Sequence, residues 1–266
     1  MNIAFISPHT NGCGCTTLAS LVALQLASKS KTTCLVNSKA YTPSIYQYLG
    51  IRDYNDKSGS IATVANLIKE DALRKEEIGN YCRQVAYGLE VFCSTDTEME
   101  QVDMDYILEY VCTLFPHEYI VFDMDDKDMF SVSNTTILDH ADCAIIVLRQ
   151  NYSDIARFKD MKDDILEAIG GIPLLTVVNG YTDIACSIKE LAMEMGISKP
   201  KNWIPVRYNG YVGWGCFKGK LQDVLQYGKS NDTRVIDIAK DIDRVAAEIQ
   251  RVKTVKKSKG ASRKGR

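Results

Sequence analysis

Two hydrophobic patterns alternate along the chain. Short apolar runs rich in Val, Ile and Phe are followed by longer stretches in which apolar residues recur at the helical period. The first pattern predicts β-strands and the second predicts α-helices. The predicted strands are Asn2 to Ser7, Thr32 to Asn37, Leu89 to Cys93, Tyr119 to Asp123, Cys143 to Arg149, Leu174 to Asn179 and Trp203 to Val206. The predicted helices are Thr16 to Ser28, Ile61 to Ile68, Met104 to Leu114, Asp154 to Ile169, Ile184 to Met195 and Val235 to Val252.

The order of these elements predicts the architecture. Nearly continuous apolar strands are typical of a parallel sheet buried on both faces, and each strand is followed by a segment long enough to cross back. Right-handed crossovers of this kind build a doubly wound α/β domain, a mostly parallel sheet with helices on both faces. We expect a single domain over residues 1–252 of the 266. Because ligands of such sheets bind at the carboxyl ends of the strands, the residues after Ser7, Asn37, Asp123 and Asn179 are predicted to surround one crevice.

Composition narrows the class of protein. Apolar residues make up 45% of the chain and charged residues 25%, which is ordinary for a soluble globular protein. The apolar runs are too short for a membrane-spanning helix, and the first residues resemble a strand and not a signal peptide, so we expect a cytoplasmic protein. Nine cysteines at irregular spacings within apolar runs predict buried reduced thiols without a disulfide framework. Cys13 and Cys15 have no second Cys or His pair at metal-binding spacing, which disfavours a zinc site there.

Charge is distributed unevenly along the chain. Eight of the 32 Lys and Arg residues lie between Arg251 and Arg266, a segment without acids, so the rest of the chain holds 24 basic against 34 acidic residues. This acidic body disfavours a broad nucleic-acid-binding face on the folded domain. Residues 253–266 are predicted to form a basic disordered tail. Contact of the tail with DNA or anionic lipid and a purely solvated tail are both left open.

The loop after the first strand is the strongest candidate for chemistry. Gly12 and Gly14 precede the first helix, where the backbone can approach an anion and the helix N-terminus offers free N–H groups. The hydroxyl of Thr16 is a candidate Mg²⁺ ligand. Two glycines before a helix rich in Thr are also common in ordinary strand-to-helix turns, which is the alternative interpretation.

The loop resembles the deviant Walker A motif of the ParA/MinD family of P-loop ATPases, written KGGxGKTT. The alignment rests on Gly12, Gly14, Thr16 and Thr17. Further segments are similar to the family in the same order: YIVFD, which ends at Asp123, resembles the switch-II strand, and ADCAIIV resembles the segment that follows. LTVVN, WIP and a helix over Gly219 to Tyr227 continue the likeness, which covers residues 1–252.

The resemblance implies a P-loop NTPase-like fold, a site for ATP or ADP with Mg²⁺, and a role for each matching residue. Asn179 would read adenine, Pro205 would lie beside the base, and Thr16 and Asp123 would hold the metal. The nucleotide site implied in this way comprises Asn11, Gly12, Cys13, Gly14, Cys15, Thr16, Thr17, Asp123, Asn179 and Pro205.

Several departures from the family pattern fall on the residues that handle phosphate. Cys15 occupies the position of the P-loop lysine, Thr10 that of the signature lysine, and Asn11 that of the first glycine. The family's DxD pair is replaced by Asn37-Ser38-Lys39. Because phosphoryl transfer depends on positioned positive charge, these changes predict little or no hydrolysis and weak nucleotide binding. Whether Lys39 restores a charge near the phosphates or faces solvent is left open.

These features favour a positioning or assembly scaffold with a degenerate nucleotide site, similar to the TadZ/CpaE-like proteins of pilus and secretion systems, or a protein of a conjugation apparatus. Such a scaffold implies a protein partner. The alternatives are a weakly active partition ATPase that dimerises on ATP and binds DNA non-specifically, and a nucleotide-sensing regulator. A monomer and a homodimer are equally compatible with the sequence. The segment Arg207 to Lys220 mixes aromatic, basic and glycine residues and is a candidate docking loop or the edge of a core.

Overall fold

The computed structural model describes residues 1–8, 12–29, 31–39, 43–51, 61–93, 101–124, 129–197 and 200–263. An eight-stranded sheet with the order β3-β4-β2-β5-β1-β6-β7-β8 forms its centre. Every neighbouring pair is parallel except β3 and β4, which are antiparallel. The strands are β1 Asn2–Ile6, β2 Thr33–Asn37, β3 Arg83–Ala86, β4 Leu89–Phe92, β5 Tyr119–Asp123, β6 Cys143–Arg149, β7 Leu174–Tyr181 and β8 Trp203–Arg207. The predicted doubly wound, mostly parallel sheet is confirmed.

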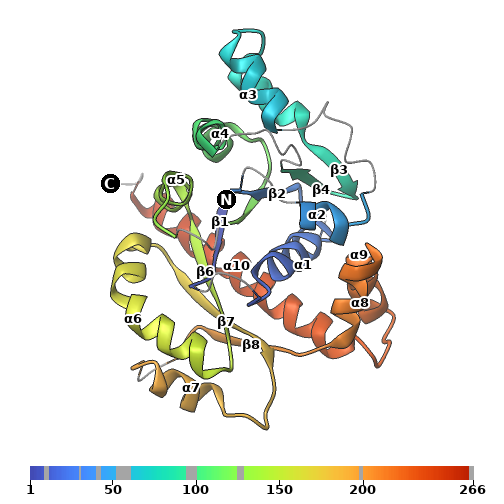
Figure 1. Cartoon of the computed structure of the whole chain (residues 1–266), viewed down its shortest axis with the longest axis vertical. Coiled ribbons are helices and arrows are strands. Elements are labelled where there is room, and N and C mark those ends of the chain that lie inside the picture. The colour runs from blue at the N-terminus through green and yellow to red at the C-terminus, as the bar shows by residue number, and fades with distance from the viewer. Residues whose placement is uncertain are drawn as a thin grey trace.

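Helices cover both faces of the sheet, as Figure 1 shows. The helical elements are α1 Cys15–Ala27, α2 Pro43–Tyr48, α3 Ile61–Lys69, η2 Lys75–Tyr81, α4 Gln101–Leu114, α5 Val132–His140, α6 Tyr152–Ile169, α7 Ile188–Glu194, α8 Gly210–Lys218, α9 Leu221–Lys229 and α10 Ile236–Arg263. Side chains of β1 alternate between the two cores: Ile3 and Phe5 pack with α1 and α10, whereas Ala4 and Ile6 pack with α3 to α6. Among the described residues, no helix is both long enough and apolar enough to cross a membrane.

Differences from the predicted elements have local causes. The edge strand β3 is half-exposed and joins β4 through a tight turn at Gly88, whose φ is 74°, so it lacks the apolar run that marks the other strands. Helix α7 begins at Ile188 and not at Ile184 because Ser187 and Glu190 form a capping box. The segment of the predicted docking loop folds largely as helix α8, which Asn209 caps by accepting a hydrogen bond from the N–H of Tyr211.

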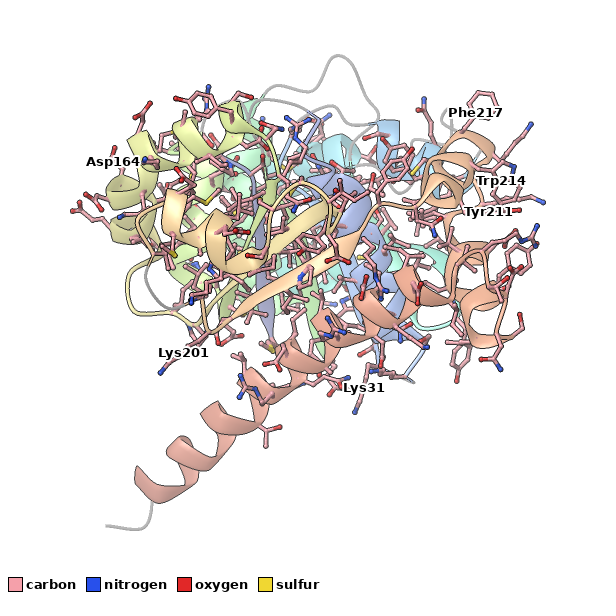
Figure 2. The ribbon with its side chains drawn as sticks, turned by 90° about the horizontal axis from the view of Figure 1, so that it is seen from below. Lys31, Asp164, Lys201, Tyr211, Trp214 and Phe217 are labelled. Carbon is pink, nitrogen blue, oxygen red and sulfur yellow. The ribbon has the colours of Figure 1, made fainter. Side chains whose placement is uncertain are left out.

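The last helix runs past its expected end at Val252. The structure continues α10 to Arg263, whereas the sequence predicts a disordered tail from residue 253. Lys and Arg are good helix formers, and a helix already started adds further residues readily. Val252 still packs against the core, and Lys253 forms a 2.8 Å ion pair with Glu118. Beyond these contacts the ribbon of α10 projects away from the body of the protein (Figure 2).

A buried carboxylate fastens α10 to the sheet. Asp241 is 1% exposed and accepts hydrogen bonds from Nε and Nη2 of Arg207 at 2.8 and 2.9 Å and from the Arg207 backbone N–H at 3.1 Å. Arg207 ends β8, so this bidentate pair joins the edge strand to the helix that covers it. Asp237, one turn earlier, contacts the same guanidinium from an exposed position at 3.5 Å.

We expect Asp241→Ala to lower the free energy of unfolding by about 2–3 kcal/mol, because a buried hydrogen-bond acceptor disappears while the half-exposed Arg207 stays charged. Asp237→Ala removes an exposed partner of the same arginine and should change stability by less than about 1 kcal/mol. Urea denaturation of both variants measures the two effects. Equal losses would show that the buried pair does not anchor α10.

Candidate functional site

The loop between β1 and α1 lies at the carboxyl edge of the sheet, where the sequence predicts the site. Gly12 and Gly14 both adopt left-handed backbone conformations, with φ values of 82° and 80°. Gly14 directly precedes α1 and, being a glycine, has no side chain that could cap the N-terminus of the helix. A loop with these two glycines lets a ligand approach the backbone closely. The positions of Thr10 and Asn11 lie outside the described residues.

Three side chains from different elements meet at this edge. The carboxylate oxygen Oδ2 of Asp123 accepts a 2.8 Å hydrogen bond from the hydroxyl of Thr16 and a 2.7 Å bond from the amide of Asn37. Asn37 and Asp123 end neighbouring strands and are paired in register, while Thr16 lies in the first turn of α1. Asp123 is 1% exposed. A hydroxyl next to a buried carboxylate is a donor set that suits Mg²⁺, so these residues fit the metal.

Asn37 stabilises the form of the loop that follows β2. Its Oδ1 accepts a 2.7 Å hydrogen bond from the backbone N–H of Lys39, while its amide group holds Asp123. The neutral amide of Asn37 therefore bridges the carboxylate of Asp123 and the loop. An ionised Asp at position 37 could not do this, because it has no hydrogen-bond donor. Lys39 is half-buried, and the hypothesis that its ammonium reaches the phosphates stays a prediction.

Asn179 packs against the loop from the end of β7. Its amide donates a 2.8 Å hydrogen bond to the carbonyl of Cys13. A Cβ atom at Gly14 would overlap Nδ2 of Asn179. Two features therefore require a glycine at position 14: the left-handed backbone conformation and the close approach of Asn179. Asn179 lies at the predicted crevice, and one of its two amide N–H groups holds the carbonyl of Cys13.

The sequence analysis missed two arginines that bind loop carbonyls. Nη1 of Arg149 donates a 3.0 Å hydrogen bond to the carbonyl of Gly12, and Nε of Arg157 donates to the carbonyl of Pro8. Arg149 is oriented by a bidentate pair with the buried Asp154, with distances of 3.0 and 2.9 Å. A usable signal existed for Arg149, because it is the last residue of a predicted strand and so had to lie at the carboxyl edge. Arg157, inside α6, offered no such signal.

The thiols of Cys13 and Cys15 lie under the loop. Cys13 donates a 2.9 Å hydrogen bond to the hydroxyl of Ser7. The contact with the Cys15 side chain lowers the pKa of the Cys13 thiol below its ordinary value, against the opposing effect of burial, and Ser7 adds to the lowering. Both side chains are buried, with exposures of 3% and 8%. They pack the first turn of α1 onto the sheet, and the thiol at position 15 brings no positive charge to the loop.

The remaining predicted site residues are placed apart. Thr17 lies beside helix α8, where its hydroxyl is 3.9 Å from the sulfur of Cys216. Pro205 lies within β8 opposite Val178, between two residues that face the α1 side. Because side chains alternate along a strand, Pro205 faces the other side of the sheet and is not brought to the loop.

Comparison with known proteins identifies structures that have the same fold. No protein-family model matches the chain, and no curated protein matches it. Solved structures do. A ParA family ATPase from Chlorobium tepidum TLS is 17% identical, with 92% of this chain and 98% of that chain covered at a TM-score of 0.69. The septum site-determining protein MinD of Pyrococcus horikoshii OT3, complexed with Mg-ADP, is 14% identical over 92% and 95% at 0.68.

A third similar structure is the MinC:MinD cell division complex of Aquifex aeolicus, which is 15% identical, covers 93% of this chain and 96% of that chain, and has a TM-score of 0.68. Nearly the whole of each neighbour is therefore spanned. The chain has the P-loop NTPase-like fold of the ParA/MinD ATPases, and the predicted resemblance in fold is confirmed.

The contact between Gly14 and Asn179 can be tested by substitution. We expect Gly14→Ala to lower the free energy of unfolding by about 2–4 kcal/mol, since it combines left-handed strain with overlap against the asparagine. Gly180→Ala is the matched control, because Gly180 is also left-handed, with φ 67°, but has no atom within 4 Å of an added Cβ. It should lower stability by about 1 kcal/mol.

Chemical denaturation of Gly14→Ala, Asn179→Ala and the double variant completes the measurement. Removal of the asparagine should restore part of the stability lost by Gly14→Ala, with a coupling free energy above about 1 kcal/mol. Strictly additive losses would show that the two residues do not contact each other.

Proposed function

We propose that the chain is a ParA/MinD-like positioning or assembly scaffold with a degenerate nucleotide site, which binds ATP or ADP with Mg²⁺ weakly and hydrolyses little or none. The observation that carries the proposal is the cluster of Thr16, Asp123 and Asn37. A hydroxyl and a buried carboxylate suited to Mg²⁺ are kept at the loop, while Cys15 and Asn37 stand where the resemblance implies a lysine and an acid.

Binding in this site would use the backbone more than side chains. Thr16 and Asp123 would hold Mg²⁺, and the N–H groups of the loop and of the first turn of α1 would receive the phosphates. Mg²⁺ supplies neutralisation of phosphate charge when it is bound. Arg149 and Asn179 donate hydrogen bonds to the carbonyls of Gly12 and Cys13, which would leave the backbone N–H groups of these residues for the ligand. The similar MinD structure contains Mg-ADP, which supports nucleotide as the ligand class.

Loss of hydrolysis follows from the same residues. A water molecule needs an acceptor to orient it for attack, and the amide oxygen of Asn37 already accepts a hydrogen bond from the backbone N–H of Lys39. Positioned cations that stabilise the transition state can contribute about 10³- to 10⁵-fold in phosphoryl transfer. Cys15 is neutral as a thiol and negative as a thiolate, so it supplies no such charge. Arg149 is neutralised by Asp154, with which it forms a bidentate pair.

Helix α8 contacts the first turn of α1 and also carries exposed aromatic side chains, so it would connect the nucleotide loop to a surface that binds a partner protein. Cys216 of α8 contacts Thr17 in the first turn of α1. The next residue, Phe217, is 83% exposed, and Tyr208 just before the helix is 74% exposed. Figure 2 shows Tyr211, Trp214 and Phe217 along this helix at the rim of the molecule. Exposed aromatic side chains are enriched at protein interfaces, and a change at Thr17 would reach them through a single contact. The MinC:MinD complex gives a precedent for a partner protein on this fold.

A second candidate function, a weakly active partition ATPase that binds DNA without sequence preference, is favoured by the basic end of the chain. Eight Lys and Arg residues follow Gln250 in the sequence, and the last part of α10 projects from the body of the protein. Such a segment would bind phosphates with a steep dependence on salt. The two functions differ in turnover, because the partition function requires hydrolysis whereas the scaffold does not.

Phosphate release in the presence of ATP and Mg²⁺ separates them. We expect turnover indistinguishable from the no-enzyme background, with the Chlorobium ParA family ATPase assayed in parallel as the active control. Nucleotide binding, measured by calorimetry on the same preparation, should be weak and should require Mg²⁺. Turnover comparable with the control would exclude the scaffold function and favour the partition ATPase.

Restoration of the lysine gives a sharper test of the degenerate site. We expect Cys15→Lys to raise the affinity for MgATP about 10- to 150-fold, because a charged hydrogen bond contributes about 1.5–3 kcal/mol. Cys15→Gln is the matched control: it adds a long neutral side chain and should leave affinity near that of the wild type. Circular dichroism checks that both variants fold. Equal affinities of folded Lys and Gln variants would show that position 15 does not face a phosphate.

A further inference from the structure

A second cluster of reactive side chains lies beside the first residues of β2 and the segment that precedes β5. Cys34 is in β2 near its amino end, Cys82 lies directly before β3, and His117 precedes β5. Glu90, in β4, is the register partner of Cys34. β2 and β5 run away from this cluster toward the edge that holds Thr16 and Asp123, whereas β3, which Cys82 precedes, runs in the opposite direction. The proposed nucleotide function uses none of these four residues.

The distances within the cluster match a tetrahedral metal site. The sulfur atoms of Cys34 and Cys82 are 3.8 Å apart. The two sulfurs and a ring nitrogen of His117 all lie within 4.8 Å of one another. Tetrahedral Zn²⁺ with Zn–S bonds of about 2.3 Å separates two thiolate sulfurs by about 3.8 Å. The thiol pair therefore already has the spacing that the metal imposes.

His117 supplies an independent sign of a missing ligand. Its side chain is 6% exposed, and its Nε2 is 2.6 Å from Oε2 of Glu90. A carboxylate accepts hydrogen bonds, so this contact places the proton on Nε2 and leaves a lone pair on Nδ1. Nδ1 is buried and is the one such side-chain atom without a hydrogen-bond partner in the part of the chain that the structure describes. Metal-binding histidines are typically oriented by a carboxylate in this way.

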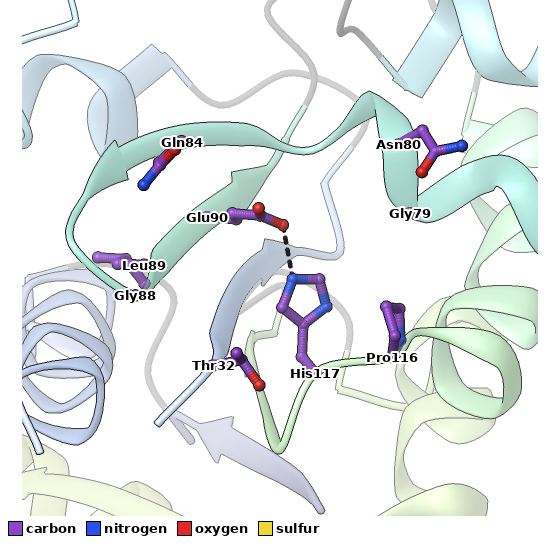
Figure 3. A pocket seen from close by; sticks show the side chains of 9 residues that line it. All are labelled: Thr32, Gly79, Asn80, Gln84, Gly88, Leu89, Glu90, Pro116 and His117. Carbon is purple, nitrogen blue, oxygen red and sulfur yellow. Dashed lines mark hydrogen bonds and ion pairs between the residues drawn. The ribbon is translucent and has the colours of Figure 1, made fainter. Parts of the chain in front are cut away.

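His117 and Glu90 line a cavity of about 320 Å³. Figure 3 shows them in it, joined by their hydrogen bond, with Thr32, Gln84 and Pro116 around them. The imidazole is therefore next to an open space, although the two cysteines do not line it. A disulfide between Cys34 and Cys82 would require the sulfurs to approach to about 2.05 Å, and it would leave Nδ1 of His117 without a partner.

We propose that Cys34, Cys82 and the imidazole of His117 bind one Zn²⁺ ion, with Glu90 orienting the imidazole. Thiolate and imidazole ligands in a tetrahedral arrangement favour zinc over magnesium or calcium. The ion would join the start of the edge strand β3 to β2 and to the segment before β5. Its role is structural, since β3 is the half-exposed strand at the end of the sheet and has a neighbour on one side alone.

Cobalt and zinc titrations of the full untagged chain, kept reduced and free of nucleotide, test the site. We expect Co²⁺ to bind one equivalent with thiolate charge-transfer and tetrahedral ligand-field absorption, and Zn²⁺ to displace it. Cys82→Ser and His117→Asn should each weaken binding by about 100-fold or more, and Glu90→Gln by about 10- to 100-fold. Cys186→Ser is the matched control, because Cys186 is also a half-buried free thiol. It should leave the affinity unchanged.

A measurement on the wild-type protein does not depend on the folding of variants. Zn²⁺ should protect Cys82 from alkylation, mapped by mass spectrometry, and leave Cys186 as reactive as before. Absence of stoichiometric Co²⁺ binding by the reduced protein would overturn the proposal. So would binding that persists in Cys82→Ser and His117→Asn, or a Cys34–Cys82 disulfide that forms while the reduced chain binds no metal. Because ATP is absent throughout, failure here leaves the nucleotide function untouched.

Discussion

The buried carboxylate of Asp123 is the constraint on which the candidate nucleotide site depends. It lies at the end of a central strand, where it is almost inaccessible to water, and a charge in such a place needs donors. Thr16 and Asn37 supply them, one from the first turn of α1 and one from the neighbouring strand. The carboxylate thus fixes the position of the helix N-terminus relative to the sheet. An ion bound at Oδ2 of Asp123 would share that oxygen with the amide of Asn37 and the hydroxyl of Thr16.

Side-chain donors also bind two backbone carbonyls of the loop, those of Gly12 and Cys13. Arg149 and Asn179 reach these carbonyls from β6, the neighbour of β1, and from β7, the next strand in the sheet. Here the protein's own donors bind both carbonyls. The contact of Thr17 with Cys216 joins the first turn of α1 to helix α8, which carries the exposed Phe217.

The sequence was sufficient to predict the sheet and the place of the site, since both depend on patterns local to one strand. Apolar runs such as Cys143–Arg149 mark buried strands, and the polar residue that ends each run marks the carboxyl edge. Edge strand β3 and helices α5 and α8 escaped prediction because their residues are half-exposed or mixed with polar ones. The role of Asn179 in holding Gly14 also escaped, because it depends on the approach of residues 165 positions apart. For Pro205 the sequence identified the strand but not the face of the sheet toward which its side chain points.

The difference between local sequence patterns and contacts that form only on folding also explains why the spacing of residues did not reveal the proposed metal site. A zinc motif is recognisable in a sequence when pairs of ligands lie a few residues apart. Cys34, Cys82 and His117 are separated by 48 and 35 residues, and Cys34 lies inside an apolar strand where a cysteine usually packs as a small apolar residue. The parallel sheet brings them together because β2 and β5 are hydrogen-bonded neighbours and β3 returns antiparallel along β4. An orphaned ring nitrogen, not a motif, identifies the site, and an orphan of this kind is visible only after the chain has folded.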